Sequence, residues 1–373
     1  MHVFILFALL NLTTGILLPP PRGPHPITYT TKSLTDHTRW DTLAPTEKQQ
    51  KRRILISIFS PLEITNDTCQ PEILPYLPSA TASQYNLILD SLGVPNYILD
   101  GFELQFCKQP LQQSSEDYPV IIFSPGFTTS RLLSSVQARD LASHGFVVIT
   151  VDHPYDATIV EFPGGEVVYG FNITDVLRNE LAENMVEVRA ADISYLINQL
   201  PNLHSNYNQS KVFVYGHSLG GATAALAASL DSRVLGGLDF DGTIYGSVND
   251  TGLDKPIVLA GRPIPEDTTE AELYDGFYDR LRGEKMLIVV NGTQHMSFCD
   301  APFLVSLRDD IPEELSTVME AVVGSIGGNK LAGILDELLV STASFVFGGD
   351  ASGMCRIDDT NDEMLVLEEE LPC

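Results

Sequence analysis

The residues best suited to chemistry lie in the segment 216–220, which reads Gly-His-Ser-Leu-Gly. An apolar run, residues 212–215, precedes this Gly-x-Ser-x-Gly motif, and a run of small residues follows it. A strand, a tight turn and a helix in this order expose a serine hydroxyl as a nucleophile. The flanking Gly216 and Gly220 avoid the clashes that a Cβ atom would make in such a strained turn. The motif therefore predicts Ser218 as the nucleophile of an acyl-transfer reaction.

A serine nucleophile needs a histidine base, and the chain contains eight histidines. His295 follows the last apolar run, where a loop would deliver its imidazole to the sheet edge that carries Ser218. His153, which also follows an apolar run, is the only serious rival. His217 neighbours the serine and is expected to point elsewhere, and His144 lies at a predicted helix end, where an imidazole suits the helix dipole. We expect His295 to be the base.

The acid that orients the base is expected in the segment 238–243, Leu-Asp-Phe-Asp-Gly-Thr. Asp239 and Asp241 would share one face of a strand, so periodicity does not choose between them. Asp241 stands at the end of the strand before a glycine turn, where its carboxylate reaches an imidazole. Asp239 lies one repeat deeper, where an unpaired charge is costly. Asp241 is therefore preferred, and Asp239 is the alternative.

An acyl-transfer site also needs N–H donors for the oxyanion that forms on the substrate carbonyl. The N–H of Leu219, immediately after the nucleophile, supplies one donor. The second is expected in the loop 124–128, Ser-Pro-Gly-Phe-Thr, which follows another apolar run. Gly126 permits an unusual backbone path, so the N–H of Phe127 is the candidate. An ordinary strand-to-helix turn is the alternative interpretation of this loop.

The elements that must position these residues are short apolar runs separated by helical patterns. Each run has a few residues, mostly β-branched or aromatic, with little alternation, which is typical of strands buried on both faces of a parallel sheet. The runs are 53–59, 120–123, 146–151, 212–215, 235–240, 257–259 and 286–290, and clear helical patterns cover 188–200 and 219–230. The alternation predicts an α/β fold with a mostly parallel central sheet flanked by helices. Ligands then bind beyond the carboxyl ends of the strands.

Several segments together resemble a known family. They are 18–24, 123–127, 140–148, 188–192, 216–223, 238–243 and 295–298. They are similar to the plasma-type platelet-activating factor acetylhydrolases, particularly the secreted fungal members, and also to bacterial esterases of the cutinase and dienelactone-hydrolase group. The resemblance runs from about residue 18 to residue 347.

This resemblance implies an α/β-hydrolase fold with Ser218, Asp241 and His295 as the catalytic triad and Phe127 and Leu219 as the oxyanion hole. It also implies calcium-independent removal of a short or oxidised acyl group from the sn-2 position of a phospholipid, as in a 1-alkyl-2-acetylglycerophosphocholine esterase. The family often has histidine before the glycine of the oxyanion loop, whereas this chain has Pro125.

Composition excludes several other classes of protein. The 22 Lys and Arg against 49 Asp and Glu give a formal net charge of −27, and the isoelectric point is about 4.4. Such a chain lacks the clustered cations that bind nucleic acid, and anionic membrane surfaces repel it. A hydrophobic content of 44% and a mean hydropathy of +0.06 argue against intrinsic disorder.

Export is predicted at the N-terminus, where the apolar residues 3–10 form a signal-peptide core within residues 1–15. Asn-x-Ser/Thr sequons agree with a secreted, extracellular glycoprotein; they lie at Asn66, Asn172, Asn208, Asn249 and Asn291. The five cysteines have no zinc-ligand spacing, which favours disulfides. Closeness in sequence predicts Cys69–Cys107, and among the remaining three we choose Cys299–Cys355, which leaves Cys373 unpaired.

The length fits one large domain with appendages. We expect a Pro-rich and then polar N-terminal arm over 16–52 that wraps the surface, an α/β-hydrolase domain over 53–349, and a solvated acidic tail over 350–373. A polar insertion over 152–185 is expected to border the ligand crevice.

The residues by themselves predict a serine ester hydrolase that acts through an acyl-enzyme. The resemblance adds the expectation that its substrate is a small-molecule or phospholipid ester. That chemistry requires no metal or organic cofactor. A general carboxylesterase or a cutinase-like polyester hydrolase would use the same residues, and a non-catalytic α/β-hydrolase that serves as a binding module is less favoured. We expect no nucleic-acid partner and no transmembrane segment, while a weak contact with a lipid interface is compatible with the sequence.

Overall fold

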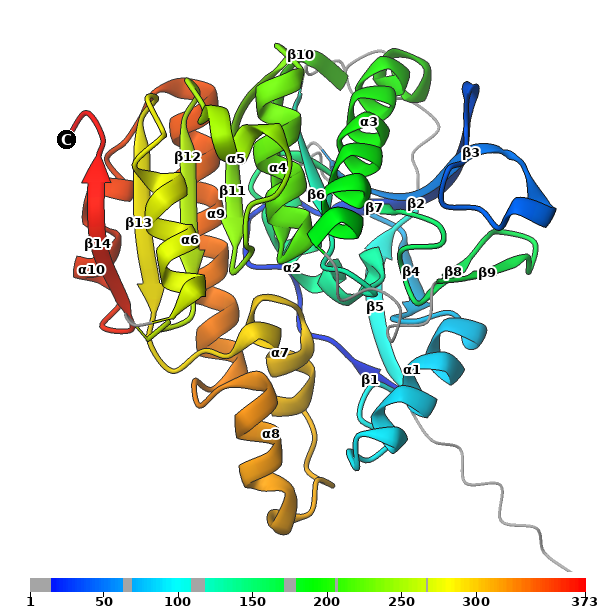
Figure 1. Ribbon diagram of the computed structural model, residues 1–373. Helices are drawn as coiled ribbons and strands as arrows, with labels where there is room; N and C mark the ends of the chain where they lie inside the picture. Colours follow the sequence, from blue (N-terminus) through cyan, green and yellow to red (C-terminus); the bar gives the residue numbers. More distant parts are fainter. Residues whose placement is uncertain (1–14, 63–68, 109–117, 171–178, 205–206, 266–267) are drawn as a thin grey trace, which may run out of the picture.

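The computed structural model describes residues 15–62, 69–108, 118–170, 179–204, 207–265 and 268–373. Its centre is a twelve-stranded sheet in the order β1-β5-β2-β3-β7-β6-β10-β11-β12-β13-β14, with β4 paired to β5 (Figure 1). A separate hairpin consists of β8 and β9. The strands are β1 Ile16–Leu17, β2 Ile27–Trp40, β3 Lys51–Pro61, β4 Pro71–Pro75, β5 Phe102–Cys107, β6 Tyr118–Ser124, β7 Val147–Asp152, β8 Ile159–Glu161, β9 Val167–Tyr169, β10 Tyr207–His217, β11 Val234–Phe240, β12 Ile257–Gly261, β13 Lys285–Val290 and β14 Met364–Glu370.

Helices cover both faces of the sheet (Figure 1). They are α1 Ser79–Ser91, α2 Ser135–Ala142, α3 Asn179–Leu203, α4 Leu219–Leu230, α5 Ser247–Thr251, α6 Thr269–Tyr278, α7 Ala301–Ser306, α8 Ser316–Val323, α9 Gly328–Gly348 and α10 Ile357–Thr360. One apolar cluster joins the sheet to α2, α7 and α9, and a second joins the other face to α3, α4 and α6. Phe213 and Tyr215 face the first cluster, and Val212 and Val214 face the second.

The central strands confirm the sequence prediction. Every predicted apolar run matches a strand, although Phe146 of the run 146–151 precedes β7. The strands β7, β6, β10, β11, β12 and β13 pair in parallel in this order. Their carboxyl ends therefore meet at one edge of the sheet, where the loops that follow them lie close together. This is the mostly parallel, helix-flanked sheet of an α/β-hydrolase.

The N-terminal arm differs from the prediction, because it builds the sheet instead of wrapping it. β2 pairs antiparallel with β3 along most of its length, from Ile27 opposite Pro61 to Trp40 opposite Lys51. The segment reads as polar because threonine, not an apolar run, supplies its β-branched residues. Leu18 and Ile27 are buried in the core.

The acidic tail is mostly exposed, as predicted for a solvated segment, but it also adds a strand to the sheet that the prediction did not include. β14 pairs antiparallel with β13 and so covers a strand whose backbone groups would otherwise lie unpaired at the sheet edge. The chain end returns to Cys355, and the disulfide is Cys355–Cys373. The predicted Cys299–Cys355 pairing is therefore wrong, since Cys299 is buried and free and its thiol donates to the Met296 carbonyl. The predicted Cys69–Cys107 disulfide is confirmed.

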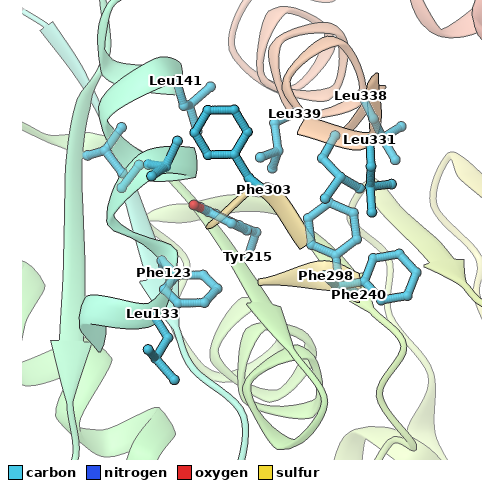
Figure 2. Close-up of a cluster of buried hydrophobic side chains, with 14 of the residues drawn as sticks. Phe123, Leu133, Leu141, Tyr215, Phe240, Phe298, Phe303, Leu331, Leu338 and Leu339 are labelled. Atoms are coloured by element: carbon cyan, nitrogen blue, oxygen red, sulfur yellow. The ribbon is translucent and has the colours of Figure 1, made fainter. Parts of the chain in front are cut away.

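Within the part of the chain that is described, one helical stretch, Glu313–Gly348, is long and apolar enough to cross a membrane by length and composition alone. The stretch comprises the separate helices α8 and α9. α9 packs against α2 and α7 and buries Leu331, Leu338 and Leu339 in the core (Figure 2). It therefore has the contacts of a core helix.

Candidate active site

Ser218 lies in the turn that joins β10 to α4, with φ 56° and ψ −124°. A left-handed φ of this kind is costly for a residue other than glycine and persists only where the surroundings impose it. A Cβ atom on Gly216 would lie 2.1 Å from the Gly220 backbone, and one on Gly220 would lie 1.9 Å from the Ser124 carbonyl oxygen. The turn is therefore a sharp elbow that only glycine permits at these two positions.

The three residues of the predicted triad come together beyond the carboxyl ends of the strands. The His295 Nε2 atom lies 3.0 Å from the Ser218 hydroxyl, and its Nδ1 atom lies 2.6 Å from an oxygen of the Asp241 carboxylate. The His295 side chain is 46% exposed and Ser218 is partly exposed, whereas the Asp241 side chain is fully buried. The serine hydroxyl and the imidazole are thus accessible from solvent, whereas the Asp241 carboxylate behind the imidazole is shielded.

Packing beneath the site fixes the separation of the acid and the base. Phe240 precedes Asp241 at the end of β11, and Phe298 closes the short helical turn His295–Phe298. The two rings stack with their centroids 5.4 Å apart, and both are fully buried. Figure 2 shows them beside Tyr215, below the α9 side chains. Phe240 anchors the end of the strand that carries Asp241, and Phe298 anchors the turn that carries His295. Packing of the two rings therefore holds the histidine loop against this strand.

Arg262, which sequence reasoning missed, also holds the Asp241 carboxylate. Its backbone N–H donates to one carboxylate oxygen at 3.0 Å, and its guanidinium donates to the other, which His295 shares. Burial acts to raise the pKa of Asp241, but the bonds from His295 and Arg262 outweigh it and hold this pKa below its usual value. Asp241 is therefore ionised at neutral pH. The only sequence signal for Arg262 is its place directly after β12, next to β11.

The alternative acid and base lie elsewhere. Burial, followed by the charge of Asp241, raises the pKa of Asp239 well above its usual value. His153 is buried, with Nε2 at 3.1 Å from the Ser124 hydroxyl and Nδ1 at 2.9 Å from Asp192, so it does not face Ser218. His217 turns away from its neighbour, with Nε2 at 2.8 Å from the His295 carbonyl oxygen.

The other histidine and the remaining nearby carboxyl have structural contacts. His144 follows the end of α2 and pairs with Asp336 at 3.0 Å. Asp300 precedes α7, and its carboxylate accepts from the Val136 and Gln137 N–H groups at the start of α2. Among the residues that the structure describes, no group of three His, Cys, Asp or Glu side chains is arranged to hold a metal ion.

The loop after β6 lies against the elbow. A Cβ atom on Gly126 would be 3.4 Å from the Ser218 Cβ atom and 3.1 Å from the His217 ring. Thr128 has a left-handed φ of 64° and forms an isolated bridge to Ala157. The start of the 152–185 insertion is thus in contact with this loop, although residues 171–178 lie outside the described part. Leu219 directly follows Ser218, and Phe127 directly follows Gly126 in the loop that lies against the elbow.

Comparison with known proteins identifies the family of the chain and several relatives. The family described as platelet-activating factor acetylhydrolase, isoform II, matches residues 80–162 and 172–309, which together are more than half of the chain. A probable 1-alkyl-2-acetylglycerophosphocholine esterase of Arthroderma benhamiae is 29% identical over 253 residues, covering 65% of this chain and 63% of that protein. The platelet-activating factor acetylhydrolase of Cavia porcellus is 26% identical and covers 56% of each chain. The matched region thus spans less than two thirds of these relatives.

The fold has a close counterpart among solved structures. A ferulic acid esterase from Streptomyces cinnamoneus superposes with a TM-score of 0.79 over 95% of this chain and all of that chain, at 24% identity. This structural similarity shows the fold, and the match to the family model shows the family to which the chain belongs. The chain belongs to the platelet-activating factor acetylhydrolase, isoform II, family.

Proposed function

We propose that this protein is a secreted serine ester hydrolase that removes a short acyl group from the sn-2 position of a phospholipid such as 1-alkyl-2-acetylglycerophosphocholine. The observation that carries the proposal is the Ser218–His295–Asp241 arrangement, with its two contacts of 3.0 and 2.6 Å. Membership of the family and the names of the relatives supply the substrate class.

The geometry supports an acyl-enzyme mechanism. His295 Nε2 accepts the Ser218 proton while the serine oxygen attacks the ester carbonyl carbon. The buried Asp241 carboxylate fixes the histidine tautomer with the proton on Nδ1 and stabilises the imidazolium that forms. The N–H groups of Phe127 and Leu219 are proposed to bind the oxyanion. The imidazolium then protonates the leaving alcohol, and water hydrolyses the acyl-enzyme by the reverse sequence of proton transfers.

The proposal is tested with a substrate panel on the purified protein. We expect turnover of 1-alkyl-2-acetylglycerophosphocholine in the presence of a calcium chelator, with a fall in rate as the sn-2 acyl chain lengthens. The Ser218→Ala variant should lose turnover of every ester in the panel. A wild-type protein that hydrolyses no ester, or a Ser218→Ala variant that keeps most of the activity, would refute the proposal.

A general carboxylesterase is the second candidate, and the exposed His295 imidazole favours it, because an open site accepts esters of varied shape. Pro125, at the place where the family resemblance leads us to expect histidine, is another reason to expect a different substrate preference. If p-nitrophenyl acetate or a polyester is turned over far faster than the acetyl phospholipid, this second function is the correct one.

Secretion is also a proposal, and the disulfides Cys69–Cys107 and Cys355–Cys373 support it, because such bonds persist in oxidising compartments. Most of the predicted signal peptide lies outside the described residues, as do the sequons at Asn66 and Asn172. Of the other sequon asparagines, Asn208 and Asn249 are partly buried and Asn291 is exposed. Recovery from the culture medium of a chain that begins near residue 16 and loses mass on treatment with an N-glycosidase would support this proposal. Retention inside the cell would contradict it.

A further inference from the structure

The direction of one backbone N–H group decides whether the loop after β6 can serve the proposed oxyanion hole. In a trans peptide unit the carbonyl oxygen and the following N–H point in opposite directions. The Gly126 carbonyl and the Phe127 N–H belong to the same unit, so whatever holds the Gly126 oxygen also aims the Phe127 N–H. Among the described residues, the Phe127 N–H has no hydrogen-bond acceptor.

The Gly126 carbonyl oxygen is held by three donors. The Thr129 hydroxyl donates to it at 2.8 Å, the Thr129 backbone N–H at 3.2 Å, and the Arg189 guanidinium at 3.3 Å. These donors occupy the side of the peptide unit opposite the Phe127 N–H. Hydrogen bonds accepted by a carbonyl also polarise its peptide unit, which makes the N–H on the other side a stronger donor.

Arg189 fixes the preceding peptide unit as well. One nitrogen of its guanidinium donates to the Pro125 carbonyl at 2.6 Å and lies 3.5 Å from the Ser124 hydroxyl. The remaining face of the guanidinium makes a two-bonded ion pair with Asp156. Arg189 thus connects α3 to two consecutive carbonyls of the loop. Both side chains are essentially inaccessible to solvent, at 1% and 0% exposure.

An arginine is the side chain that suits this position. Its planar fork presents several N–H donors in fixed directions, so that it binds a carboxylate on one edge and two carbonyls on the other. The Asp156 carboxylate neutralises a charge that would otherwise be costly to bury. A lysine keeps the charge but offers a single ammonium group, which cannot reproduce both edges.

We infer that Arg189, together with the Thr129 hydroxyl, is a positioning residue that aims the Phe127 N–H at the substrate oxyanion. This inference deepens the proposed function and rests on it. Neither side chain is expected to touch the substrate. Both act through the Gly126 peptide unit. Their loss should reduce the stabilisation of the transition state more than the affinity for the substrate.

The test compares an acetate ester with its thiono counterpart, in which sulfur replaces the carbonyl oxygen. Sulfur is a poorer hydrogen-bond acceptor, so a functional oxyanion hole favours the oxygen ester, and the ratio of the two kcat/KM values reports the hole. Removal of one oxyanion donor typically costs about 10²–10³ in kcat. For Arg189→Lys we expect kcat on the oxygen ester to fall by about ten- to a hundredfold at little changed KM. The oxygen-to-sulfur ratio should fall with it.

Two further variants make the result specific. Thr129→Val removes one of the three donors without a change in shape and should lower the ratio in the same direction. Thr129→Ser restores the hydroxyl and should bring the ratio back toward the wild-type value. Arg139→Lys is the matched control, because Arg139 is also 1% exposed but lies on α2, where it pairs with Asp140 and donates to the Pro19 carbonyl instead of the loop 124–127. It should leave the ratio unchanged.

The outcomes separate the inference from the proposed function. A wild-type ratio in both Arg189→Lys and Thr129→Val overturns the inference, even if kcat falls, because a merely structural role changes both esters equally. If Arg189→Lys does not fold, as judged by circular dichroism, Thr129→Val decides the matter. Activity of Ser218→Ala on the oxygen ester would instead refute the proposed function and leave no oxyanion hole to test.

Discussion

Replacement of Asp241 by asparagine tests which carboxylate serves His295. One oxygen of Asp241 accepts the Arg262 backbone N–H at 3.0 Å, and the other accepts both the His295 Nδ1–H at 2.6 Å and the Arg262 guanidinium. Every bond to the carboxylate therefore needs an acceptor. An amide has one acceptor and one donor group, so each of its two orientations places an NH₂ against a donor.

The orientation that keeps the Arg262 backbone bond turns the amide NH₂ toward His295. The imidazole must then accept at Nδ1 and carry its proton on Nε2, so that it can no longer accept the Ser218 proton. In a serine protease this tautomer error lowers kcat by about 10⁴-fold, which corresponds to about 5 kcal/mol of transition-state stabilisation. We expect a loss of the same order for Asp241→Asn, with little change in KM.

Asp239→Asn is the matched control. Burial, with the nearby Asp241 charge, raises the pKa of Asp239 well above its usual value, which favours the neutral carboxyl that an amide resembles closely. We expect kcat within about twofold of the wild type, because Asp239 bonds to the Tyr274 hydroxyl and not to His295 or Ser218. Both variants are measured with p-nitrophenyl acetate at pH 7.5. Loss of activity in Asp239→Asn with retention in Asp241→Asn would refute the assignment of the acid.

Three further predictions concern the framework of the site. Cys373→Ser opens a disulfide with a sequence separation of 18 residues; chain entropy predicts a loss of about 3 kcal/mol in the free energy of unfolding, and an unchanged urea midpoint would contradict it. Gly220→Ala places a Cβ atom 1.9 Å from a backbone oxygen and should abolish ester turnover, whereas Gly327→Ala, which meets nothing within 4 Å, should retain it; equal activity of the two would be the contrary result. Burial, opposed by three hydrogen bonds, raises the pKa of Asp300 from 3.8 to about 7. Its stabilising contribution is complete below pH 4 and is lost as the pH rises to about 7, by up to about 1.4 kcal/mol per pH unit. The free energy of unfolding, measured with urea at several pH values in this range, should fall less steeply with pH in Asp300→Asn than in the wild type. The same dependence on pH in both proteins would contradict the prediction.

The sequence predicts the central sheet well because its strands are buried on both faces. A run such as 212–215 is apolar throughout, and its short length and its β-branched and aromatic residues favour a strand over a helix. Ser218, Asp241 and His295 could be found for a related reason. Each directly follows or closely follows such a run, and the carboxyl ends of parallel strands meet at one edge.

The parts that sequence reasoning missed depend on pairing between distant segments. β2 is polar, and only its antiparallel partner β3 shows why it is a strand. In the same way, the acidic tail can be recognised as a strand only through its pairing with β13. This pairing also brings the chain end back to Cys355. Arg189 and Arg262 make contacts with residues 63 and 21 positions away in the chain, which no local pattern encodes.

The most direct test of the account identifies the residue that a fluorophosphonate modifies in the purified protein. Such a probe phosphonylates the hydroxyl of an activated serine, and the adduct is located by peptide mass spectrometry. The account predicts a single adduct on Ser218, with labelling strongly reduced in the variants His295→Ala and Asp241→Asn. An adduct on another residue, or an unlabelled Ser218 in a protein that hydrolyses esters, would contradict the claim that this serine is the nucleophile.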